Sequence, residues 1–494
     1  MSVLALALLA ACDRPDPTPT GPADLRFVRG GVVRDGVYAP RSWAPGDTVD
    51  GVVAPVTPEC ASLFHVELED MDRLAAMGAP APAAALAFSP DGRWLAVGSD
   101  AGSLRIVDTE TGGVRAVRTL AEGAVKQVAW GAGALYVGVQ SPDAELLAVD
   151  PTTLATRWQV RLADELETSA LPPADDVYGL YSLPAVFAIR VLNGGDLLVT
   201  GAHGWTTPEG TRTNRARLYR YAPDGTRVGA WPAAGPADAI LLHPAVSGDV
   251  ALVAMSRSAD GPAPDGLPIG GVASIDLATM TTRWTRTFEP LKPHFKSVFL
   301  WEALGVSNTL AFAGLGDGRA FLFGADGVER ATLTPGVPVL AQGVPIAAGV
   351  GFGTVVDDTA YFLTTSTNIP WGSADPMARP PAAHPAQHTL HAVGLDGTPR
   401  WVWQGEHAVQ GVVPSPDDAL LLVAAAERAT DTRTDLFGAL VFDRQTGALV
   451  TRCATEGPAY FRPVWATDGR IAVAEAPYMA DGAVRGAYRV TVFR

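Results

Sequence analysis

Residues 84–120 read AALAFSPDGRWLAVGSDAGSLRIVDTETGGVRAVRTL and contain every part of a four-stranded antiparallel sheet. Short apolar runs of strand length alternate with turn-forming residues. The strands are predicted at Ala85–Phe88, Trp94–Gly98, Leu104–Val107 and Val114–Leu120. The connections Ser89–Gly92 and Asp108–Gly112 contain Pro, which presets φ, Gly, which adopts positive φ, and Asp, which accepts hydrogen bonds from turn amides. This stretch therefore predicts one sheet made of consecutive strands.

The same pattern recurs along the rest of the chain. The further units are Val125–Leu162, Ala185–Trp231, Ile240–Phe288, Val298–Leu333, Gly343–Trp403, Val409–Cys453 and Tyr460–Arg494. A spacing of roughly 40 to 70 residues per unit is typical of propeller blades with variable loops. One such sheet cannot bury both of its faces alone, so the sheets must pack around an axis. We predict an all-β protein, a β-propeller of about eight four-stranded blades, or seven if two units share a sheet.

The final unit, Tyr460–Arg494, has three predicted strands and lacks a fourth. An earlier segment, Ser62–Glu69, alternates apolar and polar residues like a strand but has no hairpin partner next to it. We expect it to pair with Tyr488–Phe493 and so close the ring. Cys60 and Cys453 would then lie at the same seam. One disulfide between them is expected, and two separate buried thiols are the alternative.

The N-terminal residues MSVLALALLAAC form an apolar run too short to span a bilayer, which is typical of a secretory signal. The run resembles a bacterial lipobox, which implies cleavage before Cys12 and lipid on that residue. A buried N-terminal segment with an incidental cysteine is the alternative. We therefore expect a signal peptide at 1–11, a Pro-rich tether at 12–24, an irregular leader at 25–59 and the propeller at 60–494. The location expected is the bacterial envelope, periplasmic or on the outer surface.

Composition excludes some classes of partner. The chain has 37 Lys and Arg against 52 Asp and Glu, a formal charge of −15, and its lysines are Lys126, Lys292 and Lys296. A chain of this charge has no basic patch for nucleic acid, and we expect contact with a membrane only through the N-terminal lipid. The 52 Gly and 40 Pro indicate dense turns and argue against a helical protein.

A turn motif, Asp-x-x-Thr followed by Gly, Leu or Met, recurs before the outer strands, and a tryptophan follows some of these turns. The turns are Asp108–Gly112, Asp150–Leu154, Asp276–Met280 and Asp443–Gly447, with shorter Asp-Gly versions at Asp224, Asp326 and Asp396. Trp158, Trp284 and Trp401 follow the turns at Asp150, Asp276 and Asp396. This repeat resembles the quinoprotein-type (PQQ-like) propellers, in which such a Trp docks on the neighbouring blade. The segment FSPDGRWLAVGSDAGSLRIVD also resembles a WD40 repeat. Where Leu154 and Met280 replace Gly, we expect the turn to differ.

Quinone-using members of that family resemble one another in a Cys-Cys pair and in calcium-binding Glu, Asn and Asp side chains near the axis. This sequence has no Cys-Cys pair. No motif of a nucleophile elbow, zincin helix or phosphate loop occurs in it, so we expect no cofactor, no metal and no catalysis. The densest histidine group is His384, His388 and His391. We expect His391 to be in a strand already and the group to be solvated loop histidines, with a metal site as the alternative.

Long insertions fall between the second and third strands of several units, on the face where the connections between blades also emerge. They are Gly204–Arg215, Arg257–Gly271, Ser366–His388, Glu427–Asp435 and Ala476–Gly486. Function in repeat folds concentrates on such a face, although the loops could also have drifted in length. The candidate partner-binding side chains are Trp205, Trp371, Tyr178 and Tyr181. We predict a non-catalytic scaffold that docks a protein or polymer of the envelope. The alternatives are a propeller enzyme, either a quinone-linked dehydrogenase or a metal-dependent hydrolase, and a glycan-binding surface protein.

Overall fold

A computed structural model describes most of the chain, and its residues fall into two units, Met1–Pro58 and Glu59–Arg494. The described residues are 25–28, 31–34, 37–40, 48–49, 52–53, 59–68, 84–120, 123–170, 182–207, 209–210, 212–241, 243–256, 267–292, 295, 302–370, 380–405, 408–425, 437–459, 462–480 and 483–494. Cys12, the signal peptide and the tether lie outside them. So do Trp371, Tyr178 and Tyr181.

The first unit contains five short strands. Three of them form an antiparallel sheet and two form a hairpin. They are β1 (Leu25–Val28), β2 (Gly31–Arg34), β3 (Val37–Pro40), β4 (Thr48–Val49) and β5 (Val52–Val53).

In the second unit, the stretch that predicted the fold forms one sheet in the order β10-β9-β8-β7. Its strands are β7 (Ala84–Phe88), β8 (Trp94–Ser99), β9 (Ser103–Asp108) and β10 (Val114–Thr119). Asp108 Oδ1 accepts hydrogen bonds from the amides of Glu110 (2.9 Å) and Thr111 (3.0 Å), as the turn composition predicts. Gly112 lies in the left-handed region at φ 72°. The four strands confirm the prediction to within one residue at nearly every end.

Further antiparallel sets of strands follow in chain order. We call each set a blade, and the sheet of β7 to β10 is blade 1. Blade 2 has β11 (Ala124–Trp130), β12 (Leu135–Gln140), β13 (Glu145–Val149) and β14 (Thr156–Arg161). Blade 3 has β15 (Ala185–Val191), β16 (Leu197–Thr206), β17 (Arg212–Tyr221) and β18 (Arg227–Trp231). Blade 4 has β19 (Ile240–Leu241), β20 (Ala245–Ser247), β21 (Val250–Ser256), β22 (Gly271–Asp276) and β23 (Thr281–Thr287).

The C-terminal half continues in the same way. Blade 5 has β24 (Glu302–Val306), β25 (Leu310–Gly314), β26 (Ala320–Gly324) and β27 (Glu329–Leu333). Blade 6 has β30 (Val350–Val356), β31 (Thr359–Thr364), β32 (Thr389–Gly394) and β33 (Pro399–Gln404). Blade 7 has β34 (Val409–Pro414), β35 (Leu420–Ala425), β36 (Gly438–Asp443) and β37 (Leu449–Ala454). Blade 8 has β38 (Val464–Trp465), β39 (Ile471–Glu475), β42 (Arg489–Phe493) and β6 (Ser62–Glu67).

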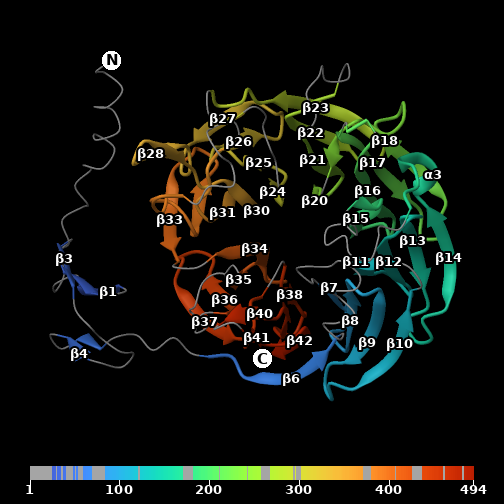
Figure 1. Cartoon of the computed structure of the whole chain (residues 1–494), viewed down its shortest axis with the longest axis horizontal. Helices are drawn as coiled ribbons and strands as arrows, with labels where there is room; N and C mark the ends of the chain where they lie inside the picture. Colours follow the sequence, from blue (N-terminus) through green and yellow to red (C-terminus); the bar gives the residue numbers. More distant parts are fainter. Residues whose placement is uncertain are drawn as a thin grey trace. The chain divides into compact units, whose positions relative to one another are not determined.

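The blades follow one another around a ring, with the first strand of each blade innermost (Figure 1). Buried apolar clusters lie between consecutive blades, so each blade covers a face of the next. The cluster between blades 8 and 1, for example, joins Val490 and Val492 of β42 to Leu95 and Val97 of β8. This arrangement confirms the all-β propeller that the repeats predict.

The ring is closed by a strand from far upstream. β6 pairs antiparallel with β42 in a register that places Glu67 opposite Arg489 and Val66 opposite Val490. This confirms the expected pairing of the orphan strand with the last blade. Next to β6, Cys60 and Cys453 form a disulfide with their Cα atoms 4.7 Å apart. The first strand of the propeller and its penultimate blade are therefore joined covalently.

The closing sheet also buries the polar side chains of Glu475, Arg489 and Thr491, which bind the exposed side chains of Glu456 and His65, and we call these five residues the seam cluster. Glu475 accepts hydrogen bonds from Arg489 Nε (3.2 Å), from the Thr491 hydroxyl and from the backbone amide of Glu456 (3.1 Å). Arg489 also forms an ion pair with Glu456 at 3.2 Å. His65 Nδ1 lies 2.8 Å from Thr491 Oγ1, and since that hydroxyl donates to Glu475, the imidazole N–H donates to it. Both charges of β39 and β42 are thus compensated.

Outer-strand aromatic side chains lock neighbouring blades together. The indole N–H groups of Trp158, Trp284 and Trp401 donate to the carbonyl oxygens of Pro223 (2.8 Å), Ala325 (3.0 Å) and Arg444 (2.9 Å) in the next blade. Each indole also covers a turn glycine, Gly225, Gly327 and Gly447, at which a Cβ would collide with the ring. Phe64 of β6 covers Gly112 in the same way. This is the docking of outer-strand tryptophans that the PQQ-like resemblance implies.

The expectation that the turns at Leu154 and Met280 differ from the Gly turns was wrong. Leu154 (φ 59°) and Met280 (φ 54°) take the same left-handed conformation as Gly112. This conformation costs a side-chain residue roughly 1–2 kcal/mol. Both side chains are buried in clusters between blades, and this burial offsets the cost.

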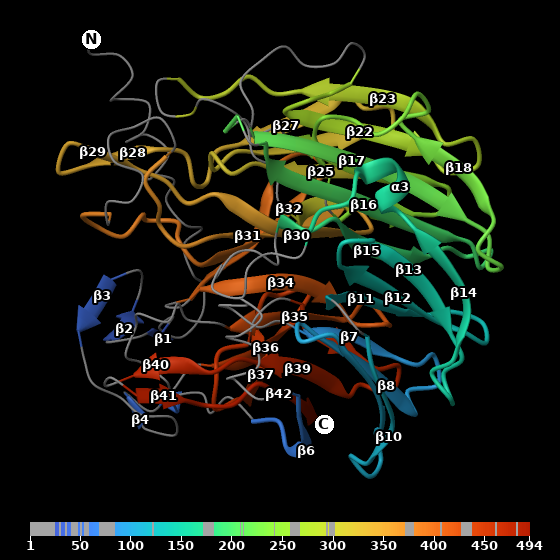
Figure 2. The same cartoon turned by 45° about the vertical axis from the view of Figure 1, so that its right-hand side comes forward.

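One of the insertions predicted on the loop-rich face is almost entirely described, whereas large parts of Arg257–Gly271, Ser366–His388 and Glu427–Asp435 lie outside the described residues. The predicted insertion Gly204–Arg215 is largely strand, because β16 and β17 pair continuously out to Thr206 and Arg212. Two further hairpins, β28 (Val339–Ala341) with β29 (Val344–Ile346) and β40 (Tyr478–Ala480) with β41 (Ala483–Arg485), lie on one side of the ring (Figure 2). A single helical turn, α3 (Ala163–Leu166), links blades 2 and 3. Within the described part of the chain, no helix has the length and apolarity needed to cross a bilayer.

Candidate functional site

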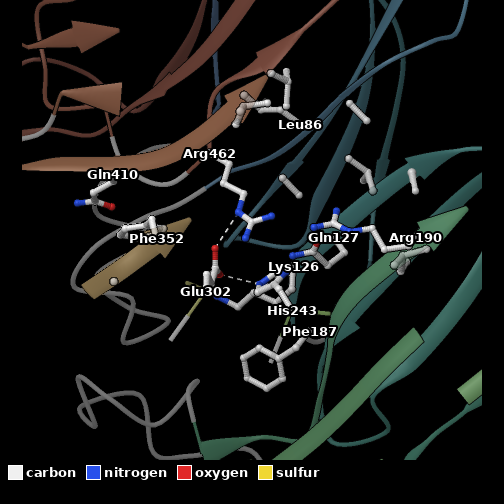
Figure 3. Close-up of a pocket in the computed structure, with 18 of the residues that line it drawn as sticks. Leu86, Lys126, Gln127, Phe187, Arg190, His243, Glu302, Phe352, Gln410 and Arg462 are labelled. Carbon is white, nitrogen blue, oxygen red and sulfur yellow. Dashed lines mark hydrogen bonds and ion pairs between the residues drawn. The ribbon is translucent and has the colours of Figure 1, made fainter. Parts of the chain in front are cut away.

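The innermost strands surround a central channel that encloses about 1020 Å³. Figure 3 shows the charged side chains that gather there, from separate blades. Arg190 comes from β15 of blade 3 and Glu302 begins β24 of blade 5. His243 lies where the inner edge of blade 4 is interrupted between β19 and β20, and Arg462 precedes β38 of blade 8. We call these four residues the channel cluster.

Glu302 is the centre of this cluster and uses both carboxylate oxygens. His243 Nε2 lies 2.8 Å from Oε1, and Arg462 Nε lies 2.8 Å from Oε2. The side chains of His243 and Glu302 are 13% and 16% exposed, and that of Arg462 is 33% exposed, so the cluster faces the channel while protein surrounds it. Each oxygen of the carboxylate therefore already has one partner within the cluster.

The charge states follow from this arrangement. Burial alone would raise the pKa of Glu302, but the charge of Arg462 and the hydrogen bonds from His243 and Arg462 outweigh it and hold that pKa well below its usual range. Burial lowers the pKa of His243 despite the neighbouring carboxylate, so its imidazole is neutral at pH 7. The Nε2–H then donates to Glu302, and Nδ1 is left without a hydrogen-bond partner among the described residues.

Arg190 differs from its neighbours because it has no counterion. Its guanidinium makes no hydrogen bond or ion pair with the residues the structure describes, and Figure 3 shows it turned toward the channel. Burial and the like charge of Arg462 lower the pKa of Arg190 to about 10, although Glu302 opposes this. The guanidinium remains charged at pH 7.

Lys126 of β11 adds another cation to the channel wall. Its Nζ forms an ion pair with Asp100 Oδ1 at 2.8 Å, and the Asp100 side chain is 1% exposed. The remaining wall is largely apolar, with Leu86, Phe187 and Phe352 among the side chains that line it. The channel therefore combines a few fixed charges with an apolar surface, which is the composition of a ligand site.

The predicted partner-binding residue that the structure describes is Trp205, at the outer end of the β16–β17 hairpin. Its indole stacks on His203, with the ring centroids 4.2 Å apart. The His203 nitrogens lie 2.9 and 3.0 Å from the carbonyl oxygens of Leu166 and Ser182. Trp205 is half-buried, so it presents one face of its ring rather than a free side chain.

The expectation of solvated histidines was wrong for His384 and His388, whereas His391 lies in a strand as expected. His384 and His388 are buried, and their Nε2 atoms lie 3.1 Å from the Val337 carbonyl oxygen and 2.9 Å from Ser366 Oγ. His391 belongs to β32 and stacks on Phe362 at 4.8 Å. The segment packs back on the end of β31, where the Ala386 carbonyl accepts a hydrogen bond from Thr364, and this packing buries the rings.

The donor set of the channel can be tested against the quinone and calcium that the PQQ-like resemblance implies. Its carboxylates, Glu302 and Asp100, are each already paired with cations. Cys60 and Cys453 are bonded to each other at the seam. Among the described residues, no three His, Cys, Asp or Glu side chains converge in a way that could hold a metal ion. These residues do not fit a calcium-bound quinone.

Sequence reasoning missed the channel cluster, although a signal was present. Arg190, Glu302 and Arg462 are each a charge within or beside an inner strand that is otherwise apolar, in VFAIRVL, VFLWEAL and YFRPVWA. In a propeller the inner strands of all blades face one axis, so isolated charges at these positions converge. His243, between β19 and β20, completes the cluster.

Comparisons with known proteins agree with this fold. The family model for the WD40 domain of anaphase-promoting complex subunit 4 matches residues 73–133. No curated protein was found to match the sequence. Two similar solved structures are a europium-containing methanol dehydrogenase (12% identity, 88% of this chain and 93% of that chain, TM-score 0.52) and the quinohemoprotein alcohol dehydrogenase of Comamonas testosteroni (12% identity, 86% and 78%, TM-score 0.52). BamB of Moraxella catarrhalis is also similar (14% identity, 69% and 81%, TM-score 0.41). The two dehydrogenase structures, which are similar over most of this chain, agree with its β-propeller fold.

Proposed function

We propose that this protein is a lipid-anchored propeller of the bacterial envelope that docks another protein on its loop-rich face, without chemistry of its own. The observation that carries the proposal is the hairpin β28–β29, which leaves the ring between blades 5 and 6. Leu340 on this hairpin is 73% exposed, more than any other large apolar side chain that the structure describes. The core of a protein interface is apolar, and an ordered hairpin holds Leu340 in a fixed position from which it can contact a partner.

A second described anchor supports the same face. Connections between blades and those between second and third strands emerge on one side of a four-stranded antiparallel sheet, so the Trp205 hairpin and the β28–β29 hairpin share that side. Trp205 is held in place by His203, which lowers the entropy lost when it contacts a partner. The location in the envelope and the lipid on Cys12 rest on the lipobox resemblance.

The docking proposal is tested by photocrosslinking in cells that make the protein. A photoreactive residue is placed at Leu340, at Trp205, or at Val402 on the outer strand β33, which is also exposed. Leu340 and Trp205 should give the same discrete crosslinked protein, and Val402 should not. Identical products from all three positions, or none from the loop-rich face, would contradict the proposal.

The membrane anchor is tested separately. Cys12→Ser should move the protein from the membrane fraction to the soluble fraction while its thermal unfolding stays unchanged. A variant that remains in the membrane fraction would refute lipidation at Cys12 but would not affect the docking test.

A further inference from the structure

The charges that line the channel do not balance. Lys126, Arg190 and Arg462 carry three positive charges, whereas Asp100 and Glu302 carry two negative ones, and His243 is neutral. The excess cation lies at the centre of a chain whose formal charge is −15. A positive site inside an acidic protein is not a general property of the surface and requires a local reason.

The excess positive charge is localised at Arg190. Both oxygens of Glu302 are engaged by His243 and Arg462 at 2.8 Å, and Asp100 is engaged by Lys126 at 2.8 Å. Every other charged group of the cluster therefore has an ionic partner, and Arg190 has none among the described residues. An unpaired charge surrounded by protein is costly, so its retention is favourable when something else supplies the counterion.

The space beside Arg190 is large and apolar. At about 1020 Å³ the channel is at the upper end of the size of ordinary ligand sites. Phe187 and Ile189 flank the position of Arg190 on the same strand, and Phe352 and Leu86 belong to the wall. A small inorganic anion would leave most of this apolar surface in contact with water.

We propose that the channel binds a monoanion in which one carboxylate is carried on an apolar body, with Arg190 as the ion-pairing residue. A planar carboxylate accepts two parallel hydrogen bonds from a guanidinium. A single negative charge balances the one excess cation, whereas a phosphate monoester dianion would leave a net negative charge in a poorly solvated site. The apolar body covers the aromatic and aliphatic wall.

The proposal is tested by titration calorimetry on the full chain with decanoate, decanol, decyl phosphate and acetate, each below its micelle concentration. Decanoate should bind with a stoichiometry of one. Decanol, which lacks the charge, and acetate, which lacks the body, should each bind at least about tenfold more weakly, because a hydrogen bond to a charged group contributes at least that factor. Decyl phosphate should bind more weakly than decanoate.

Two variants assign the effect to Arg190. Arg190→Met keeps the length of the side chain and should weaken decanoate at least about tenfold while leaving decanol unchanged. Arg190→Lys should retain part of the preference for the anion. Arg157→Met is the matched control, because Arg157 lies on the outer strand β14 and is paired with Asp150. It should bind all the compounds as the unmodified chain does.

The outcomes that overturn the proposal are specific. Equal affinity for decanoate and decanol, or no loss in Arg190→Met, would show that the channel does not select an anion. Tighter binding of decyl phosphate would overturn the carboxylate assignment. Absence of decanoate binding would also overturn it. None of these results bears on the loop-rich face, so the docking proposal is tested independently.

Discussion

The seam cluster and the channel cluster are built from the same kinds of side chain but differ in how completely their charges are paired. At the seam, Glu475 and Arg489 bind each other, and their remaining polar atoms bind backbone amides, Thr491 and Glu456. In the channel, Glu302 is paired with His243 and Arg462, but Arg190 has no partner among the described residues. A buried network that is complete stabilises the fold, whereas an incomplete one beside a cavity is organised for something that binds there.

The largest effect is expected at the disulfide of the seam. Changing both Cys60 and Cys453 to Ser should lower the free energy of unfolding by about 4 kcal/mol, because the bond restrains two residues separated by 393 positions in the unfolded chain. Guanidinium denaturation of the two proteins measures this difference. Cys12→Ser is the control, since it removes a cysteine without removing the bond. A difference no larger than that of the control would mean that the bond does not secure the seam.

Removing the charge of Glu475 should produce the next largest change. Glu475→Gln leaves Arg489 buried without its main counterion, and we expect the free energy of unfolding to fall by about 3 kcal/mol. The exposed pair Arg157–Asp150 gives the comparison, and Arg157→Met should change stability by less than about 1 kcal/mol. If the two substitutions changed the free energy of unfolding equally, the ion pair at the seam would be no more stabilising than an ordinary surface ion pair.

His391 tests how a buried ring nitrogen without a hydrogen-bond partner among the described residues affects stability when it is not part of the channel. Burial lowers the pKa of His391 from 6.5 to about 4, and its Nε2 has no partner among the described residues. Between these two values the unfolded chain binds a proton that the folded chain does not, so the stability falls as the pH decreases through this window. The loss attributable to His391 should reach roughly 2 to 3 kcal/mol at the acid end.

The measurement is the free energy of unfolding from pH 8 to pH 4 for the unmodified chain and for His391→Phe. The variant should have a shallower slope between pH 6.5 and pH 4, with a constant offset from the unmodified chain above pH 7. Parallel curves over the whole range would show that His391 does not titrate abnormally.

The smallest change in stability is expected at Arg190. Because this guanidinium has no ionic partner to lose, Arg190→Met should alter the free energy of unfolding by less than about 1 kcal/mol, with the sign toward greater stability. Thermal unfolding in the absence of added carboxylate measures it. A loss as large as that of Glu475→Gln would assign Arg190 a structural role and remove the contrast between the two clusters.

The parts that could be predicted from the sequence are those written in local patterns. The alternation in Ser62–Glu69 predicted a strand, and the missing fourth strand of the last unit predicted its partner, β42. The Asp turns and the outer tryptophans could also be predicted from the sequence, because each depends on residues close together in the chain. Leu154 and Met280 were not, since the left-handed conformation there depends on burial between blades.

The channel cluster is harder to predict for a physical reason. Arg190, Glu302 and Arg462 come from different blades, and each reads as one charge in an apolar strand. Their proximity is set by the angle that each blade occupies around the axis, which no local pattern encodes. His384 and His388 were misinterpreted for a related reason, because a Pro-rich stretch predicts exposure and does not indicate the strand on which it packs.

The pairing of β6 with β42 imposes an order on biogenesis. A polypeptide emerges from the ribosome N-terminus first, so β6 is made long before the residues that complete its sheet. Until then the apolar side chains of Phe64 and Val66 lack their native cover, which makes the nascent chain dependent on slow, long-range contacts and vulnerable to association with other chains. The ring therefore closes only after the whole chain has been synthesised. A chaperone that shields β6 until then would act on this protein before any partner of the finished ring.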